Sequence, residues 1–407
     1  YRRFYVDTLA SAGGNGSLST PWKTLNQVNS FQSNLLPGDT ISLKRNQDFK
    51  GHIYFDHISG TKEANIVFNT FGIGAKPRIH VDTIGYGNIP DDRWLFRFYN
   101  SNHISVNDLY FFQPGIDTTD NTNSGTAIGG IALYFDGSNG CKSIGNDFSS
   151  LPAGVAVRGD SALVRRCNFW RLIAGKNDVG NGDDDWGSVP ITLYGASHCL
   201  IDSNYAYRCY SPSLDYGING GNGGSVEFFF GNCDSNTVLR NTFVICSGSF
   251  EFGGSPGNTA KGNVIMYNTC INSGSWLTIH QENSQAFPMD VENLKFWNNT
   301  MYEDSIVFTN AKNMILVDQT SNNVNVVDMR YNNFINKNLT SPTIGINNAY
   351  AGNVQLGGQL IHMYNTYTMN PGDNIGYILD PTETLTVWQQ PTIVPNKGIK
   401  IRRNIKF

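Results

Sequence analysis

The chain is poor in charged residues and has no long apolar run. Only 15% of its 407 residues are Asp, Glu, Lys or Arg, and the formal net charge is −4 with no basic stripe. We therefore expect no nucleic-acid partner, because proteins that bind nucleic acids gather Lys and Arg on one face. No apolar stretch approaches the roughly 20 residues that cross a bilayer as a helix. The sequence predicts a soluble protein without a membrane span.

Cysteine patterns that hold metals or disulfide frameworks are also missing. The seven cysteines include no C-x-x-C spacing, and their odd number excludes complete pairing within one chain. We expect them to be small buried side chains.

Glycine, asparagine and aromatic residues are abundant, and they recur in a pattern. The chain has 43 Gly, 24 Phe and 19 Tyr, a composition typical of a strand-rich and turn-rich protein. One pattern recurs at spacings of 27 to 37 residues. It consists of a short alternating apolar run, a Gly or Asn turn, and a second apolar run beside Asn. Strand-based repeats of this length predict a solenoid. The recurring asparagines are Asn204, Asn241, Asn268, Asn299, Asn333 and Asn365.

The repeated asparagines have a structural interpretation. An Asn side chain both donates and accepts hydrogen bonds, so stacked copies at one corner of a coil can satisfy the backbone groups that a turn leaves unpaired. We assign this ladder to Asn204, Asn241, Asn268, Asn299 and Asn333.

Residues 1–80 differ from the repeats. A strand at 4–7 and a glycine loop at 13–16 precede a predicted helix that begins near Pro21. Leu25, Val28, Phe31 and Leu35 keep helical spacing. A short helix at this place would cover the open end of a strand stack.

These N-terminal segments carry a resemblance to a known group of proteins. Residues 4–7, 13–16, 21–25, 37–41 and 49–51 resemble the cap and first coil of secreted bacterial right-handed parallel β-helix carbohydrate-active enzymes, the pectate-lyase-like superfamily. The resemblance implies an all-β, right-handed parallel β-helix with an N-terminal capping helix. It also implies a secreted, periplasmic or cell-surface protein with a carbohydrate ligand. The reaction stays open, because the group includes lyases, glycoside hydrolases, epimerases and tailspikes.

The predicted organisation is a single parallel β-helix domain over residues 1–407. Its parts are a cap with the first coils at 1–80, coils at 81–370 with loop inserts at 173–190 and 210–224, and a closing segment at 371–407. The sequence does not indicate an oligomeric state.

Seven strand-like segments can be aligned by the turns that follow them. The first and third residues of each are apolar and should point into the coil, because side chains alternate across a strand. The second and fourth residues then point outward. The second residues are Ala132, Ala156, Thr192, Glu227, Glu251, Thr278 and Val307, and the fourth are Tyr134, Arg158, Tyr194, Phe229, Gly253, His280 and Thr309.

Two consecutive segments place Glu227 and Glu251 at the same outward position. Adjacent parallel strands lie about 4.8 Å apart, so the carboxylates would repel each other unless a proton, a cation or a substrate separates them. We interpret the pair as the acid and the nucleophile or base of glycoside hydrolysis. The structural alternative is a surface Glu ladder bridged by Lys or Arg, or holding Ca²⁺.

Other polar and aromatic residues are candidates around this pair. Asp215 is a further candidate for the acid or base, should one of the two glutamates not serve. It lies in the insert at 210–224, whose many glycines predict a mobile flap beside Glu227. Arg158, Tyr194 and His280 stand in the second outward column and could bind sugar hydroxyls or a carboxylate. The further candidate substrate-binding residues are Glu282, Trp186 and Trp276.

Asp183, Asp184 and Asp185 follow one another in the first insert. They are a candidate Ca²⁺ site, although their spacing is not that of an EF-hand, and a solvated acidic turn is the alternative. The predicted chemistry itself requires no cofactor.

The sequence thus predicts a polysaccharide-degrading enzyme, with a glycoside hydrolase as the leading interpretation. A polysaccharide lyase acting on a uronic-acid polymer is the second, but such a groove should present stacked Lys and Arg or a clear Ca²⁺ cluster. The outward columns contain one Arg and no Lys. The third interpretation is a glycan-binding β-helix without catalysis, which does not require the Glu pair.

Overall fold

The computed structural model describes most of the chain. The described residues are 1–81, 94–113, 130–175, 186–210, 224–280, 287–304, 314–318, 326–337, 344–347, 360–363, 365–369, 374–379 and 385–389. The chain divides into two compact units. Unit 1 comprises Tyr1–Thr192 and Cys199–Asn222, and unit 2 comprises Leu193–His198 and Gly223–Phe407. The single domain expected from the sequence stays a prediction.

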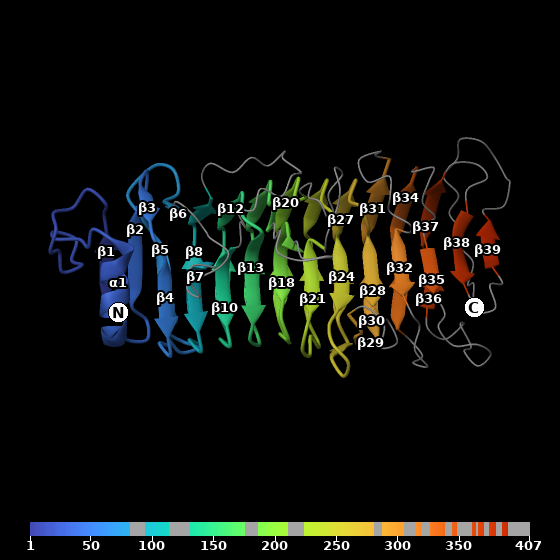
Figure 1. The fold of residues 1–407 in the computed structure, drawn as a ribbon, viewed down its shortest axis with the longest axis horizontal. Helices are drawn as coiled ribbons and strands as arrows, with labels where there is room; N and C mark the ends of the chain where they lie inside the picture. Colours follow the sequence, from blue (N-terminus) through green and yellow to red (C-terminus); the bar gives the residue numbers. More distant parts are fainter. Residues whose placement is uncertain are drawn as a thin grey trace, which may run out of the picture. The chain divides into compact units, whose positions relative to one another are not determined.

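Unit 1 is built from three parallel sheets, and each complete coil gives one strand to sheets A, B and C in that order (Figure 1). Sheet A contains β1 (Arg3–Val6), β2 (Thr40–Lys44), β5 (Ile66–Phe71), β8 (Ile104–Asn107), β11 (Lys142–Ile144), β14 (Leu163–Arg165) and β19 (Leu200–Asp202). Sheet B contains β3 (Asp48–Lys50), β6 (Arg78–His80), β9 (Tyr110–Phe112), β12 (Asp147–Ser149), β15 (Asn168–Trp170) and β20 (Tyr205–Tyr207). Sheet C contains β4 (Ile53–Asp56), β7 (Trp94–Tyr99), β10 (Ile131–Asp136), β13 (Ala153–Arg158) and β18 (Val189–Leu193). An antiparallel pair is formed by β16 (Ala174–Gly175) and β17 (Trp186–Gly187).

Unit 2 repeats this plan. Its sheet A strands are β22 (Thr237–Leu239), β26 (Val264–Met266), β30 (Leu294–Trp297), β33 (Val327–Arg330) and β36 (Leu360–Met363). Its sheet B strands are β23 (Thr242–Val244), β27 (Thr269–Ile271), β31 (Thr300–Glu303), β34 (Asn333–Asn336) and β37 (Thr366–Met369). Its sheet C strands are β21 (Val226–Phe229), β24 (Phe250–Gly253), β28 (Leu277–His280), β32 (Ile315–Asp318), β35 (Ile344–Asn347), β38 (Asn374–Leu379) and β39 (Leu385–Gln389), of which β39 is antiparallel to β38. A further parallel pair is formed by β25 (Thr259–Lys261) and β29 (Asp290–Glu292).

The predicted fold class is confirmed. The architecture is all-β and forms a right-handed parallel β-helix, with parallel pairing between successive coils in all three sheets. Each coil buries the alternate side chains of its strands against those of the next coil, which is why no single repeat is stable alone.

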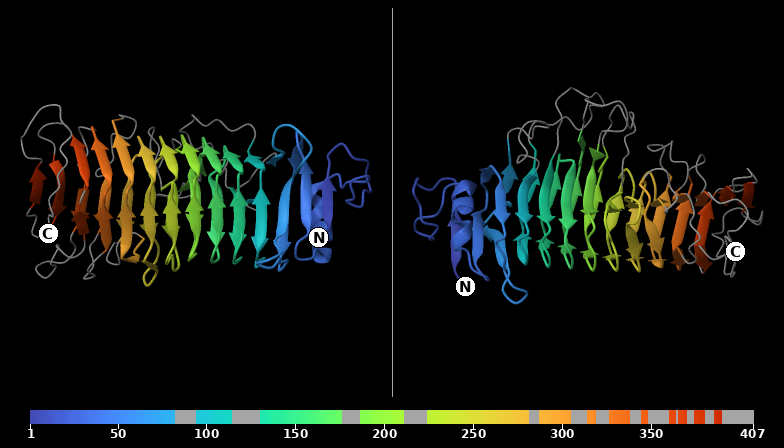
Figure 2. Two further views of the ribbon diagram at one scale, coloured as in Figure 1. Left: turned by 180° about the vertical axis from the view of Figure 1, so that it is seen from behind. Right: turned by 60° about the horizontal axis from the view of Figure 1, so that its bottom comes forward.

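A short helix caps the N-terminal end of unit 1, as predicted. Helix α1 (Leu25–Phe31) leads into the 3₁₀ turn η1 (Gln32–Asn34), and it begins later than Pro21. The side chain of Gln27 accepts a hydrogen bond from the backbone N–H of Thr24 at 3.1 Å, which supplies a partner at the start of the helix. Leu25 and Val28 are buried. Figure 2 shows α1 at the end of the strand stack that carries the N-terminus.

Aromatic stacks and small thiols fill the interior. In unit 1 the rings of Phe111, Phe148 and Phe169 stack in sequence, with centroid separations of 5.3 and 4.8 Å. All seven cysteines are buried and free, which confirms their predicted role. Burial raises the pKa of Cys141 and of Cys270 to about 12, so these thiols stay protonated.

The asparagine ladder exists, with one residue corrected. In unit 2 the side-chain amide of Asn241 donates to Asn268 at 2.9 Å, and Asn268 donates to Asn299 at 3.0 Å. Asn299 then donates to Asn332 at 3.2 Å, so the ladder continues through Asn332 and the prediction of Asn333 was wrong by one position. The ladder side chains also bond buried backbone groups of neighbouring coils, and Asn332 continues to Asn365. In unit 1, Asn204 makes the same backbone contacts, accepting from the N–H of Cys167 and donating to the carbonyl of Val164.

The alignment of the outward columns was wrong by two residues in unit 1. The strands β10 and β13 pair Tyr134 with Ala156 and Asp136 with Arg158, so Tyr134 and Arg158 do not share a column. Ala132 and Ala156 point away from the interior by alternation, but both are completely buried. The repeat pattern therefore gave the register between these two strands incorrectly.

Candidate active site

The paired glutamates occupy neighbouring strands of sheet C in unit 2. Strands β21, β24 and β28 follow one another in this sheet (Figure 1). The register pairs Glu227 with Glu251, and Glu251 with Thr278. Val226 and Phe228 are buried on either side of Glu227, which leaves the carboxylate side chain on the outer face. The predicted register of the two glutamates is confirmed.

His280 contacts one member of the pair. Its Nε2 atom lies 3.1 Å from Oε1 of Glu251, and the two side chains are only 16% and 17% exposed. The contact runs diagonally from β28 to β24, since Glu251 pairs directly with Thr278. An imidazole that bonds a carboxylate through Nε2 does so as the donor, which fixes the proton on that nitrogen. The arrangement orients the Glu251 carboxylate.

A glycine beside the pair lets three side chains approach one another. A methyl group on Gly253 would lie 2.7 Å from the ring of Phe229, 3.2 Å from Cβ of Phe287 and 3.3 Å from Cδ2 of His280. The first separation is shorter than real side-chain contacts and the other two are tighter than most, so a larger residue would have to displace the Phe229 ring. Glycine at position 253 therefore allows Phe229, Phe287 and His280 to lie close together beside Glu251.

Aromatic rings border the carboxylates. Phe229 lies 5.2 Å from Phe287 and 4.8 Å from Phe230, measured between ring centroids. The Phe230 ring stacks on Tyr194 at 6.5 Å with an interplanar angle of 19°. Phe230 and Phe287 are each 43% exposed. We call Tyr194, Phe229, Phe230 and Phe287 the aromatic border.

Backbone hydrogen bonds hold Phe287 in place. Its carbonyl accepts the N–H of Gly254 at 2.9 Å, and the carbonyl of His280 accepts the N–H of Met289 at 3.0 Å. Phe287 itself has a positive φ of 55°, an uncommon conformation for a bulky residue. These bonds place Phe287 beside β24, with its Cβ next to Gly253.

The sequence pattern predicted that Phe229 faces outward but did not mark it as a site residue, and it did not single out Phe230 or Phe287 at all. Phe229 and Phe230 directly follow the buried Phe228. Because side chains alternate along a strand, three consecutive phenylalanines must place at least one ring on the outer face. That run was an available signal for an apolar outer surface. Phe287 had none, since its approach depends on the return of the chain to Gly254.

The other predicted site residues are distributed as follows. Trp276 is completely buried and stacks on Phe334 at 5.6 Å, so it does not form the predicted sugar platform. Arg158 lies in unit 1, where its Nη1 is 3.7 Å from Asp136. Trp186 lies in β17, and its side chain is outside the described residues. Asp183, Asp184, Asp185, Asp215 and Glu282 lie outside the described residues.

The described residues contain no group of three or more His, Cys, Asp or Glu that could hold a metal ion. Strands β21, β24 and β28, which are described in full, contain neither Lys nor Arg. The outer surface of these strands therefore combines two carboxylates and one imidazole with apolar rings. Among the helices of the described part of the chain, none is long and apolar enough to cross a membrane.

Comparison with known proteins supports the fold. No family model and no curated protein sequence matches the chain. A tailspike protein mutant of E. coli bacteriophage HK620, solved in complex with a pentasaccharide, is similar in structure at a TM-score of 0.59 and 13% identity. The similarity covers 89% of this chain and 63% of the tailspike chain, so the chain spans less than two thirds of that protein. At this identity the likeness shows a shared fold.

Two enzymes are similar at lower scores. The native lacto-N-biosidase from Eubacterium ramulus has a TM-score of 0.49 and 12% identity, with 90% of this chain and 68% of that chain covered. An alginate lyase from Paenibacillus sp. str. FPU-7 has a TM-score of 0.49 and 16% identity, with 85% and 97% covered. These two likenesses carry no argument about the chain. Its sheet topology and its likeness to the tailspike define the class as the right-handed parallel β-helix.

Proposed function

We propose that the chain is a polysaccharide-degrading enzyme, a glycoside hydrolase whose catalytic pair is Glu227 and Glu251. The observation that supports it most is the pairing of these two glutamates on adjacent strands. Two outward carboxylates at such spacing repel each other and weaken the sheet, so the arrangement calls for a reason outside stability. A glycosidic bond placed between an acid and a carboxylate is cleaved by this pair of groups.

The contact with His280 supports one division of the roles between the two glutamates. An imidazole N–H that donates to a carboxylate holds that carboxylate in one orientation, so we assign Glu251 as the nucleophile or as the base that activates water. Glu227 then protonates the leaving oxygen. His280 is a positioning residue, because it acts on the substrate through Glu251.

The aromatic border supplies a surface for the sugar. The C–H faces of a pyranose ring pack on aromatic rings, and Phe230 and Phe287 expose almost half of their surface beside the glutamates. Residues of this kind hold a substrate in place by contact area, while the carboxylates act on one bond.

Hydrolysis is favoured over elimination by the charges near the pair. A lyase must neutralise the carboxylate of a uronic acid before its C5 proton can leave, and it uses cationic groups or a metal for this. The strands that carry Glu227, Glu251 and His280 contain no Lys or Arg. Bond cleavage between two carboxylates needs no such cation.

The test is a product assay with matched variants. The chain is incubated with a panel of neutral, uronic and sulfated polysaccharides, and both new reducing ends and the ultraviolet absorbance of unsaturated uronates are measured. We expect reducing ends without that absorbance. Glu227→Gln and Glu251→Gln should each lower turnover by about a thousandfold or more. Glu292→Gln is the control, since Glu292 forms a surface ion pair with Lys261 in the separate β25–β29 pair and should leave turnover unchanged.

Three results would contradict the proposal. Unsaturated products would identify a lyase. Near-normal turnover in both glutamine variants would remove the catalytic pair. Tight glycan binding with no product from any polysaccharide would identify a binding protein.

A further inference from the structure

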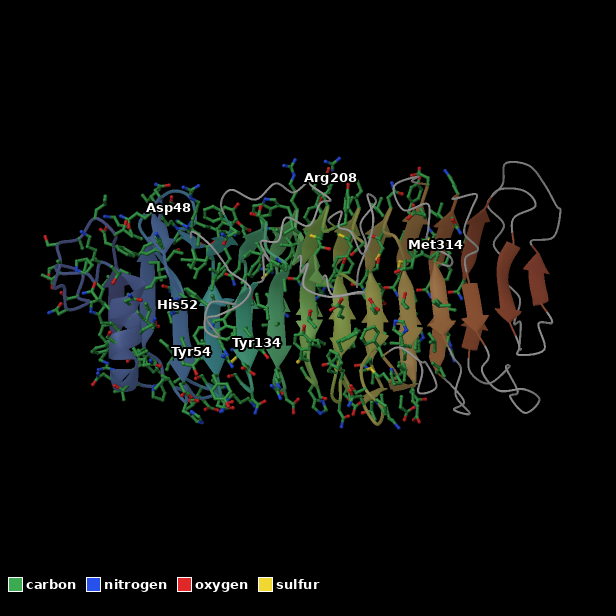
Figure 3. The ribbon with its side chains drawn as sticks, in the orientation of Figure 1. Asp48, His52, Tyr54, Tyr134, Arg208 and Met314 are labelled. Carbon is green, nitrogen blue, oxygen red and sulfur yellow. The ribbon has the colours of Figure 1, made fainter. Side chains whose placement is uncertain are left out.

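A second polar cluster lies in unit 1, on the outer face of β4, β7 and β10. The register places Arg97 between Tyr54 and Tyr134. The guanidinium carbon of Arg97 is 4.0 Å from the ring centroid of Trp94, 5.2 Å from that of Tyr99, 5.6 Å from Tyr54 and 5.8 Å from Tyr134. Figure 3 labels Tyr54 and Tyr134. Each of the four rings is partly exposed.

One buried carboxylate serves two arginines in this cluster. The Asp136 side chain is 5% exposed and accepts a hydrogen bond from Nε of Arg97 at 3.0 Å. Its other oxygen lies 3.7 Å from Nη1 of Arg158, whose side chain is 66% exposed. Both Arg97 hydrogen bonds go to Oδ2 of Asp136, and the 3.7 Å separation from Oδ1 is too long for a hydrogen bond from Arg158. The guanidinium of Arg158 is therefore largely open to solvent.

A second carboxylate lies in the same row of the sheet. Asp56 lies in the same register row as Tyr99 and Asp136, but its carboxylate bonds Nδ1 of the adjacent His57. The phenol of Tyr134 interacts with both Asp136 and Arg158, and burial first and then the charge of Asp136 raise its pKa above the ordinary value of 10.0. The phenol of Tyr134 is therefore protonated at neutral pH.

Aromatic rings beside an exposed guanidinium match one class of ligand. A pyranose ring packs its C–H face on Trp94 or Tyr134. A carboxylate on that sugar receives paired N–H donors from Arg158, in a geometry that the planar guanidinium fits. We propose that Trp94, Tyr134 and Arg158 form a second glycan site, which binds a sugar residue bearing a carboxylate. Arg97 and Asp136 hold this surface in shape.

This site is independent of the proposed hydrolysis. Its residues belong to unit 1, while Glu227, Glu251 and His280 belong to unit 2. A second site of this kind would retain an acidic polymer whichever bond the enzyme cleaves. Its presence can be measured without any turnover.

The experiment measures binding by titration calorimetry on the full chain carrying Glu251→Gln. The probes are oligosaccharides of galacturonate, mannuronate, guluronate and glucuronate, a sialylated oligosaccharide, the methyl ester of the galacturonate probe, and a sulfated and a neutral oligosaccharide. We expect at least one carboxylate-bearing probe to bind, and esterification of a bound galacturonate probe to weaken binding by about tenfold or more. Added salt should weaken binding as well.

Variants locate the binding. Arg158→Gln should weaken it by about tenfold, and Trp94→Ala or Tyr134→Ala by about fivefold or more. Arg166→Gln is the matched control, because Arg166 is exposed in the same unit at the corner between β14 and β15, and it should change nothing. Circular dichroism checks that each variant is folded.

Four outcomes would overturn the inference. They are the absence of binding to every carboxylate-bearing probe, equal binding of the acid and its ester, a preference for the sulfated or the neutral probe, and unchanged binding in Arg158→Gln. Loss of hydrolysis alone would leave the result intact, so failure of this site and failure of the proposed function are distinguished.

Discussion

The outer faces of sheet C in the two units use one scaffold for two kinds of chemistry. In unit 1, β7 and β10 present Arg97 and Asp136, a charge pair that is neutralised and framed by aromatic rings. In unit 2, β21 and β24 present Glu227 and Glu251, a pair of like charges. Opposite charges stabilise a strand pair and like charges destabilise it. The buried residues of both units form the same fold, although their outward residues differ. Outward positions can therefore vary, and acquire function, without a change of fold.

The first way to test this contrast is to remove the buried carboxylate of unit 1. Asp136→Ala leaves Arg97 among aromatic rings without its carboxylate partner, and we expect the free energy of unfolding to fall by about 3 kcal/mol. Denaturant unfolding followed by circular dichroism measures the change. Glu251→Gln, which removes a repulsive charge, should change stability by less than about 1 kcal/mol. Equal losses of unfolding free energy in the two variants would contradict the claim that the charge pair of unit 1 stabilises the fold and the pair of unit 2 does not.

The second test concerns the residue that supports Glu251. His280→Ala should lower kcat by about ten- to a hundredfold, because a hydrogen bond to a charged group is lost. KM should change little, since the side chain acts through Glu251. His280→Gln keeps an N–H donor and should recover part of the loss. Equal activity in the Ala and Gln variants would show that the hydrogen bond does not orient the carboxylate.

The third test separates the scaffold from both faces. Asn332→Ala removes a ladder residue that donates to the carbonyl of Phe296 and accepts from Asn299. Unfolding should become easier by about 2 kcal/mol, because buried backbone groups lose their partners. Asn333→Ala, one residue along the chain, is the control and should cost less than about 1 kcal/mol. Turnover per folded molecule should be unchanged in both, and a drop in kcat would connect the ladder to the site.

The smallest expected effect is a pH dependence confined to the face of unit 1. The pKa of Tyr134 is raised, first by burial and then by Asp136, so the folded state holds this proton more tightly than the unfolded chain. Its contribution to stability is complete below pH 10 and is lost as the pH rises through the higher folded-state value. Tyr134→Phe removes this dependence, a difference of less than about 1 kcal/mol because the ring is partly exposed. Parallel stability curves for the two proteins above pH 10 would contradict it.

Much of the fold was predictable because it repeats. Regular apolar runs and turns predicted a strand-based solenoid and a helix over its end, and the resemblance of the N-terminal segments implied a right-handed parallel β-helix. The same regularity placed Glu227 opposite Glu251. Local ambiguity explains the errors. Asn332 and Asn333 are adjacent and both could fill a corner, and only the hydrogen bonds select Asn332.

The rest depends on contacts between distant residues. Trp276 resembled an outer platform in the sequence, but it packs on Phe334 from a later coil. Arg97 and Asp136 are separated by 39 residues and meet only because β7 and β10 pair in one register. The contact between His280 and Glu251 likewise needs the diagonal approach over Gly253. The spacing of these residues in the sequence does not predict that they are in contact.

The central claim is that Glu227 and Glu251 act together on one bond, and kcat/KM of the double variant tests it most directly. Groups that act as a unit do not contribute additively. We expect Glu227→Gln, Glu251→Gln and the double variant to lose similar amounts, each about a thousandfold or more. Losses that multiply in the double variant, or near-normal turnover in either single variant, would contradict the account.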